Sequence, residues 1–295
     1  MYVYINGEIV RKEEARISPF DHGYMYGLGA FETFRTYNGH PFLLDDHLER
    51  LNDSLKDMNI GLTLHRHEVM AIVDQLLKVN QLKDAYVRLN VSAGIGDIGL
   101  QTDPYTAPTV IVYMKPLPLL SSGEKVCTIL KTKRNSPEGE KRLKSHHYLN
   151  NILGKREIGS DPRIEGIFLN EKGVIVEGIV SNIFWVKNGI VYTPALETGA
   201  LNGITRQFVL AILSVLQVRY EEGLYSLDEL EKAEEVFLTN SIQEIVPVSQ
   251  IHDRLYPGQR GLVTQLLQKH YQRFTSSLWT RHELELIERT DITLW

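Results

Sequence analysis

A lysine and a glutamate near the middle of the chain could together support covalent chemistry. Lys144 follows Arg142 and Leu143 and precedes two histidines, and Glu177 lies among strand-forming and small residues. A lysine amine can bind an aldehyde as a Schiff base, and a carboxylate can keep a pyridine nitrogen protonated. The pair therefore suggests a pyridoxal phosphate site. Most lysines and glutamates are solvated surface charges, so the rest of the chain must decide.

The composition limits the classes of protein to which the chain can belong. Of its 295 residues, 43% are hydrophobic and 23% are charged, which is typical of one large globular domain or two ordinary ones. The net charge of −5 provides no broad basic surface and argues against nucleic acid as a partner. The sequence has no signal-peptide pattern and no apolar stretch near the ~20 residues of a membrane helix. Because Cys127 is its single cysteine, we expect a cytoplasmic protein without disulfides.

Residues 1–115 predict a first domain of strands and helices. Asn6-Gly7 separates two short apolar runs and predicts an opening hairpin, since both residues accept the positive φ angles of a tight turn. Apolar residues recur at spacings of three and four over residues 46–58 and 69–77, which predicts two amphipathic helices. Residues 86–91 alternate as a strand does, and residues 109–114 read as a more buried strand.

Residues 116–124 interrupt regular structure with two prolines and a Ser-Gly cluster, so we expect an interdomain linker there. Residues 125–295 then predict a second, C-terminal domain that would bind the cofactor. It contains strand-like segments and ends in an amphipathic helix, with weaker patterning after Phe274. Helices and strands mix in both halves without a regular βαβ alternation. The pattern therefore favours two α+β domains over a doubly wound parallel sheet.

Two short loops are candidate phosphate sites. The segment Leu201–Arg206 is a glycine turn that opens into a helix, where free backbone N–H groups and a threonine hydroxyl suit a phosphate. Thr239–Ser241 follows a strand-like run and offers further hydroxyls. Arg50 on the first predicted helix could add a bidentate contact. Taken singly, each has an ordinary explanation as a loop, a helix start or a solvated charge.

Other chemical motifs have little support. His146 and His147 are adjacent, so on a helix they would face different directions, and no carboxylate or cysteine cluster accompanies them. We therefore expect no metal site. Gly27 and Gly29 lack the βαβ frame of a dinucleotide motif. No Gly-x-Ser-x-Gly elbow supports serine hydrolase chemistry.

Taken together, the motifs resemble those of the class IV pyridoxal phosphate enzymes, which include branched-chain and D-amino acid aminotransferases and aminodeoxychorismate lyases. The resemblance runs from about Tyr2 to about Phe274 and is carried in order by residues 176–184, 202–206, 239–241 and 244–247. It implies the two-domain α+β fold of D-amino acid aminotransferase-like enzymes, known as pyridoxal phosphate fold type IV. It also implies a homodimer with active sites near the subunit interface.

The resemblance assigns roles residue by residue. Lys144 matches the Schiff-base lysine, and Glu177 matches the partner of the pyridine nitrogen. Tyr148 lies where the branched-chain enzymes place a tyrosine near the ring oxygen of the cofactor. The matches to the phosphate contacts are Arg50, Ile204, Thr205 and Ser241.

The choice of activity within the family depends on the substrate pocket. Residues 18–23, 26–35, 134–139 and 143–151 look like those of bacterial aminodeoxychorismate lyases, which implies release of 4-aminobenzoate and pyruvate for folate synthesis. In this interpretation Arg35 and Arg88 are candidate carboxylate partners, from their charge and location. No second substrate is needed, because the cofactor stays in its aldehyde form.

Three alternatives remain open. Tyr86-Val87-Arg88 matches a Tyr-x-Arg element of branched-chain aminotransferases, although residues two apart always share a strand face. D-Amino acid aminotransferases carry an Arg-x-His carboxylate trap, but here Asp97 and Gly99 stand near those positions. An aspartate would repel a substrate carboxylate, which disfavours that activity. A non-catalytic cofactor-binding protein is a minor alternative, against which the intact lysine, glutamate and phosphate set argues.

Overall fold

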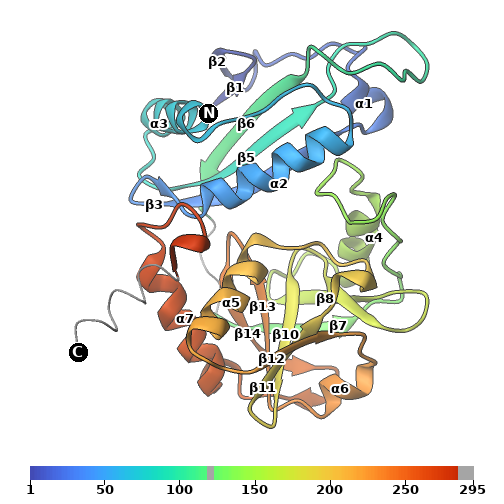
Figure 1. Ribbon diagram of the computed structural model, residues 1–295, viewed down its shortest axis with the longest axis vertical. Coiled ribbons are helices and arrows are strands. Elements are labelled where there is room, and N and C mark those ends of the chain that lie inside the picture. Colours follow the sequence, from blue (N-terminus) through green and yellow to red (C-terminus); the bar gives the residue numbers. More distant parts are fainter. Residues whose placement is uncertain (118–122, 285–295) are drawn as a thin grey trace. The chain divides into compact units, whose positions relative to one another are not determined.

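The computed structural model describes residues 1–117 and 123–284, which form two compact units, each with its own sheet (Figure 1). Of the described residues, unit 1 comprises 1–117, Leu143–His147 and Thr275–Thr280, and unit 2 comprises 123–142, Tyr148–Phe274 and 281–284. The predicted two-domain α+β class is confirmed. Among the residues that the structure describes, no helix has the length and apolar character needed to cross a bilayer.

Unit 1 contains a six-stranded antiparallel sheet in the order β2-β1-β6-β5-β3-β4. Its strands are β1 (Tyr2–Ile5), β2 (Glu8–Arg11), β3 (Gly29–Tyr37), β4 (His40–Pro41), β5 (Ala85–Ser92) and β6 (Thr109–Pro116). The predicted hairpin at Asn6-Gly7 joins β1 to β2, and both turn residues have positive φ, at 46° and 101°. The structure therefore contains the tight turn that Asn6-Gly7 predicts.

Three helices belong to this unit: α1 (His22–Tyr26), α2 (Leu44–Asp57) and α3 (Arg66–Asn80). The apolar stripe of α2, with Leu51 and Leu55, packs with that of α3 against one face of the sheet. Alternate residues of β5, such as Val87 and Leu89, point into this core. Because side chains alternate along a strand, Arg88 points to the opposite face, which carries the candidate substrate contacts.

Unit 2 contains a mixed nine-stranded sheet in the order β12-β11-β10-β13-β14-β7-β8-β9, with β15 paired to β14. Its strands are β7 (Lys125–Ile129), β8 (Ile164–Leu169), β9 (Ile175–Gly178), β10 (Asn182–Lys187), β11 (Ile190–Pro194), β12 (Tyr220–Gly223), β13 (Glu235–Asn240), β14 (Glu244–Ile251) and β15 (Arg254–Leu255). The helices are α4 (Leu149–Ile158), α5 (Ile204–Val215), α6 (Leu227–Glu231) and α7 (Leu262–Phe274), with short 3-10 turns at Leu196–Thr198 and Gly258–Arg260. Trp185 is fully buried and lies in an apolar core of this unit.

The division into units differs from the one predicted, in which residues 125–295 form a single C-terminal domain. The segments Leu143–His147 and Thr275–Thr280 belong to unit 1 instead. Hydrogen bonds of the backbone explain this: Phe31 N donates to Lys144 O (3.0 Å), and Leu43 N donates to Leu278 O (3.1 Å). Such pairing between distant segments leaves no local sequence signal. Of the predicted linker 116–124, residues 118–122 lie outside the described part of the chain.

Shortening a buried side chain on α2 should show how far unit 1 depends on its helix–sheet core. Leu55 is fully buried, so Leu55→Ala should lower the free energy of unfolding by about 2–5 kcal/mol, through lost apolar burial and the cavity left behind. Denaturant unfolding followed by circular dichroism measures the change. Lys56→Ala, on the exposed side of the same helix, is the matched control and should stay within about 0.5 kcal/mol of the wild type. Equal losses in the two variants would contradict this account.

Candidate active site

Lys144 is held in unit 1 by antiparallel pairing of its segment with the start of β3. Ser145 forms a bridge with Ala30, and hydrogen bonds between the backbones lie on either side of that bridge. Ala30 is buried in the helix-covered core, so Ser145 shares its side of the sheet. Lys144 therefore projects to the opposite face, where its Nζ lies 4.6 Å from the ring centroid of Phe31. Main-chain pairing thus fixes where this amine is presented.

Arg88 lies on the same face of unit 1. Its guanidinium carbon is 3.6 Å from the ring centroid of Phe31, and its Nη2 donates to Asn90 Oδ1 at 3.5 Å. A planar guanidinium on an aromatic ring keeps a defined orientation, which suits recognition of a carboxylate. The structure therefore brings Lys144 and Arg88 against one buried ring. Sequence reasoning had assigned no role to Phe31.

Arg35, the other candidate carboxylate partner, lies further along β3. It shares the sheet face of Phe31 because the two residues are an even number of positions apart. Its guanidinium carbon is 4.4 Å from the ring centroid of Tyr37, rather than stacked on Phe31. Arg88 is therefore the stronger of the two candidates for contact with a substrate bound near Lys144.

Arg50 on α2 belongs to a buried ionic cluster. Its Nε and Nη2 each donate to the carboxylate of Glu32 at 2.7 Å, and His47 Nδ1 donates to the same group at 2.6 Å. Burial alone would raise the pKa of Glu32, but the charges and hydrogen bonds of Arg50 and His47 lower it to about 2. Glu32 therefore fixes the orientation of the Arg50 guanidinium. The role of Arg50 as a phosphate contact remains a prediction.

Glu177 lies in unit 2, on β9, with only 5% of its surface exposed. Arg134 Nε donates to its Oε1 at 2.8 Å, and the backbone N–H of Leu201 donates to its Oε2 at 2.9 Å. These partners keep the buried carboxylate in one orientation. A carboxylate that is to pair with a pyridine nitrogen needs such a fixed orientation. Leu201 also connects Glu177 to the turn that precedes α5.

Arg134 is a site residue that sequence reasoning missed. It is buried, its Nη1 donates to Asn150 Oδ1 (2.7 Å) and Asn151 Oδ1 (3.2 Å) in the first turn of α4, and its guanidinium lies 5.3 Å from the ring of Phe168. Its position in a lyase-like stretch was the one available signal. Nothing in that stretch indicates which carboxylate it pairs with, because the pairing joins residues distant in sequence.

The predicted phosphate loops lie together in unit 2. Gly203 precedes α5 without a side-chain cap, so the first N–H groups of this helix are available to an anion. Thr205 Oγ1 and Ser241 Oγ are 3.4 Å apart, which joins the helix start to the second loop. A Cβ on Gly203 would collide with Asn182 Oδ1, so the close turn requires glycine. The arrangement fits a phosphate group.

Two more hydroxyls adjoin this region of unit 2. Thr239, on β13, pairs in register with Asn182 on β10. Its Oγ1 is buried without a hydrogen-bond partner among the described residues, and so is Ser181 Oγ. A buried hydroxyl usually has a partner, so these atoms further support a polar ligand at this end of the sheet.

The remaining predicted contacts are less defined. Ile204 and Thr205 are buried at the start of α5. Tyr148 immediately precedes α4, its carbonyl accepts from Ile152 N at 3.0 Å, and its side chain is half-buried. Its contact with the cofactor ring stays a prediction. Groups of three or more metal-ligating side chains are not found in residues 1–117 and 123–284.

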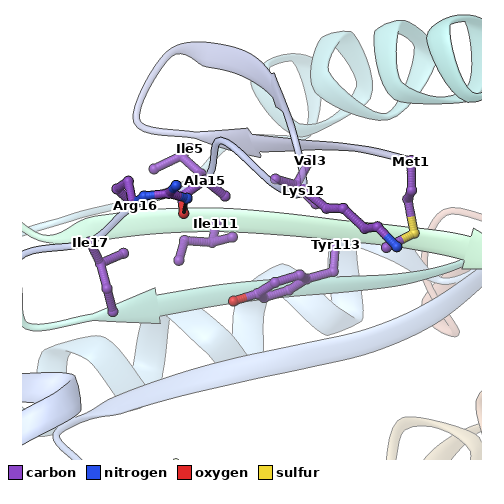
Figure 2. Close-up of a pocket in the computed structure, with 9 residues that line it drawn as sticks. All are labelled: Met1, Val3, Ile5, Lys12, Ala15, Arg16, Ile17, Ile111 and Tyr113. Carbon is purple, nitrogen blue, oxygen red and sulfur yellow. Dashed lines mark hydrogen bonds between the residues drawn. The ribbon is translucent and has the colours of Figure 1, made fainter.

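A pocket of about 270 Å³ lies elsewhere on the open face of the unit 1 sheet (Figure 2). Apolar side chains of β1 and β6 and of the segment 12–17 line it, with Tyr113 at one side. Its two cationic residues are engaged nearby: Lys12 Nζ lies 3.6 Å from Glu13 Oε1, and Arg16 donates to the carbonyls of Glu13 and Ala15. Since the lining is mainly apolar and both cationic side chains are engaged with neighbouring groups, the chemistry is assigned to the groups described above.

Each unit therefore presents part of what pyridoxal phosphate requires. Unit 1 presents a lysine amine and an oriented arginine, and unit 2 presents a paired buried carboxylate and an uncapped helix start with adjacent hydroxyls. These are donors for an aldehyde, a pyridine nitrogen and a phosphate. The residues present fit this cofactor.

Comparison with known proteins places the chain in a family. Residues 29–251 match the family described as amino-transferase class IV. The chain therefore belongs to the class IV aminotransferases, whose members depend on pyridoxal phosphate. The family predicted from the sequence motifs, and its cofactor, are confirmed.

The chain is also similar to individual proteins of this family. The chain is 48% identical to the aminodeoxychorismate lyase of Bacillus subtilis strain 168, over 92% of this chain and 94% of the relative. Among solved structures, it resembles 4-amino-4-deoxychorismate lyase from Pseudomonas aeruginosa with a TM-score of 0.83, at 28% identity, over 93% of this chain and 99% of that one. It also resembles a branched-chain aminotransferase from Thermoproteus uzoniensis with a TM-score of 0.83, at 31% identity, over 94% and 95% of the two chains.

Removing Arg134 should expose the dependence of Glu177 on its partner. Arg134→Met would remove the nearer of two cations from the buried carboxylate of Glu177 and leave only the Nε of Arg142, at 3.9 Å. The free energy of unfolding should therefore fall by up to about 3–5 kcal/mol, and cofactor affinity should fall with it. Chemical denaturation and titration with pyridoxal phosphate measure the two effects. Arg163→Met is the matched control, because the ion pair of Arg163 with Asp161 is on the surface, and it should behave like the wild type. A stable Arg134→Met protein with normal cofactor binding would contradict this role.

The Glu32 cluster predicts a specific pH dependence of stability. The pKa of Glu32 is lowered to about 2 from its usual 4.5, so its stabilising effect is complete above about pH 4.5 and is lost as the pH falls through 2. The effect should be on the order of 3 kcal/mol. Unfolding free energies measured between pH 5 and pH 2 for the wild type and Glu32→Gln provide the comparison. The variant should be less stable near neutral pH and should lose less stability on acidification; parallel curves would refute the assignment.

Proposed function

We propose that the protein is a 4-amino-4-deoxychorismate lyase, which uses pyridoxal phosphate to convert its substrate to 4-aminobenzoate and pyruvate for folate biosynthesis. The observation that carries this proposal is the 48% identity, over 92% of the chain, to a Bacillus subtilis protein named as that lyase. The site described above is consistent with it, because it provides a base, an anion for the cofactor ring and cationic groups for a substrate with two carboxylates.

The residues of the chain would act in distinct ways. When bound, pyridoxal phosphate supplies an electron sink that stabilises negative charge on the carbon next to the substrate nitrogen. Lys144 would remove the proton from the amino-bearing carbon of the substrate. Loss of that proton expels the enolpyruvyl ether from the neighbouring carbon, and the ring becomes aromatic. A proton then converts the expelled enol to pyruvate, so no second substrate is consumed.

Other residues would hold the cofactor during these events. Glu177, fixed by Arg134 and Leu201, would keep the pyridine nitrogen protonated. Thr205, Ser241 and the N–H groups at the start of α5 would bind the phosphate, with Arg50 as the arginine contact.

Recognition of the substrate is assigned to the open face of the unit 1 sheet. Arg88, stacked on Phe31, is the proposed partner of a substrate carboxylate, and Arg35 is a second candidate further along the sheet. Cations on this face would also attract a dianionic substrate over a distance of about one Debye length, roughly 8 Å at physiological salt.

Branched-chain amino acid transamination is the second candidate function. It is favoured by the Tyr86-Val87-Arg88 element and by the structural likeness to the Thermoproteus enzyme. D-Amino acid transamination has less support, because Asp97 is exposed in the loop where an arginine would be expected. A non-catalytic role stays the minor alternative, since the cofactor residues are intact.

We further propose a cytoplasmic homodimer. Leu149, Ile152 and Leu153 form an exposed apolar stripe on α4, at positions that share one helix face. A second copy of the chain would cover such a stripe, and sedimentation of the purified protein tests the proposal.

A direct product assay tests the lyase assignment. Freshly prepared aminodeoxychorismate should yield 4-aminobenzoate and pyruvate in equal amounts, with no amino acceptor in the mixture. Parallel reactions with branched-chain or D-amino acids and 2-oxoglutarate should yield little glutamate. Efficient transamination without 4-aminobenzoate would overturn the proposal, and a colourless protein that borohydride does not alter would support the non-catalytic alternative.

Arg88→Met and Arg35→Met extend the test to the substrate contacts. Arg88→Met should raise KM for aminodeoxychorismate by roughly 10- to 100-fold, as expected for loss of a charge-assisted hydrogen bond. A smaller effect is expected for Arg35→Met. Unchanged KM in both variants would remove these residues from the substrate site.

A further inference from the structure

His146 occupies a defined position beside Lys144 in unit 1. Its backbone N–H donates to Gly29 O at 2.9 Å, next to the bridge between Ser145 and Ala30. Because Lys144 and His146 are two residues apart on an extended segment, their side chains project to the same face. The imidazole lies near Phe31, with 6.3 Å between ring centroids and 28° between planes. The same aromatic ring therefore borders both side chains.

Gly29 makes room for this imidazole. A Cβ at position 29 would collide with Cε1 of His146, and Nδ1 would be only 2.6 Å away. The ring therefore lies over the backbone of β3, and its Nδ1 side is directed at residues 29 and 30.

The chemical state of His146 is set by its surroundings. Burial, followed by the charge of Arg88, lowers its pKa to about 4, so the ring is neutral near neutral pH. The backbone of Ala30 opposes this shift through a hydrogen bond. Nε2 is buried without a hydrogen-bond partner among the described residues, whereas Nδ1 lies on the side of the ring that faces the backbone of β3, so the Ala30 carbonyl favours a proton on Nδ1. In a neutral imidazole whose Nδ1 carries the proton, Nε2 is an acceptor.

We propose that His146 is a positioning residue for Lys144, and that its Nε2 accepts a hydrogen bond from the Lys144 amine while that amine carries the substrate proton. A flexible lysine side chain needs such an acceptor to hold one orientation through removal and return of a proton. The inference rests on the proposed role of Lys144 as the base. His146 takes no proton itself and is not a catalytic residue.

Three substitutions separate a hydrogen-bond acceptor from a space-filling ring. His146→Gln places an amide oxygen near the position of Nε2, His146→Asn places one near Nδ1, and His146→Leu fills the space without any acceptor. His147→Leu is the matched control, because His147 is the exposed neighbour on the same segment. Each is to be prepared as the full-length protein loaded with pyridoxal phosphate.

The value of kcat should depend on whether residue 146 has an acceptor atom at the position of Nε2. His146→Leu and His146→Asn should lower kcat by about 10- to 100-fold, the effect of one hydrogen bond to a charged group, with KM changed less than about threefold. His146→Gln should recover kcat to within about threefold of the wild type, and His147→Leu should match the wild type. A structural role would impair Gln, Asn and Leu variants alike, and that result would overturn the proposal. So would wild-type kcat in His146→Leu, or a loss confined to KM, which would assign His146 to the substrate.

A readout independent of turnover completes the test. Borohydride reduction followed by peptide mass spectrometry should find the cofactor attached to Lys144 in every variant. In the cofactor-free full-length protein, an amine-selective acylating reagent should modify Lys144 several-fold faster in His146→Leu than in the wild type or His146→Gln, because an ammonium that loses its acceptor releases its proton more readily. Equal modification rates, or failure of both His146→Leu and His146→Gln to attach the cofactor, would overturn the inference.

Failure of this inference is distinguishable from failure of the proposed function. If the wild type forms no 4-aminobenzoate, the lyase assignment fails. The His146 variants are then compared in whichever transamination reaction the wild type catalyses, since that reaction also moves a proton through Lys144. The acylation experiment does not depend on either substrate.

Discussion

The pairing of residues 144–146 with β3 is the interaction on which the candidate site depends. It brings a segment from the middle of the chain into the sheet of unit 1 and sets the side of the sheet on which each of its side chains lies. A shift of one residue in this register would turn Lys144 into the helix-covered core. The observed register places the side chains of both Lys144 and His146 near the ring of Phe31. The position of the amine is thus set by backbone hydrogen bonds, which hold it more firmly than contacts of a flexible side chain would.

Two buried carboxylates determine how the cationic and anionic groups are oriented. Glu32 and Glu177 are both removed from water, and each is held by an arginine together with a second donor. Taking an ion out of water is costly, so each carboxylate requires its partners, and each arginine is thereby fixed. At Glu32 the result is an oriented Arg50, and at Glu177 it is an oriented carboxylate. The cost of burying an unpaired charge therefore fixes a cation, Arg50, in unit 1 and an anion, Glu177, in unit 2.

The sheet face of unit 1 that carries the candidate substrate contacts follows from the alternation of side chains in its sheet. Apolar residues of β3 and β5 point to α2 and α3, and the intervening positions are left to face the opposite side. On that face the two arginines pack on different aromatic rings: the guanidinium of Arg88 lies over Phe31, and that of Arg35 lies over Tyr37. The proposed lyase activity therefore depends on a cationic face built over aromatic rings, while the cofactor groups of unit 2 would serve any activity of the family.

The sequence by itself determined the features that depend on neighbouring residues. The hairpin at Asn6-Gly7, the apolar stripe of α2 and the glycine turn before α5 are local patterns, and the structure contains all three. The ordered motifs also determined the family and its cofactor, because residue types at a cofactor site are constrained by its chemistry.

Only the tertiary structure decided which residues face one another. The pairing of Arg134 with Glu177 and of Arg50 with Glu32, the inclusion of Leu143–His147 in unit 1 and the place of His146 over Gly29 all join distant segments. Periodicity gives the side of a strand or helix on which a residue lies, but it carries no information about which distant segment packs there. Register, burial and the partners of each buried charge depend on the packed chain, so they became visible only once the chain was folded.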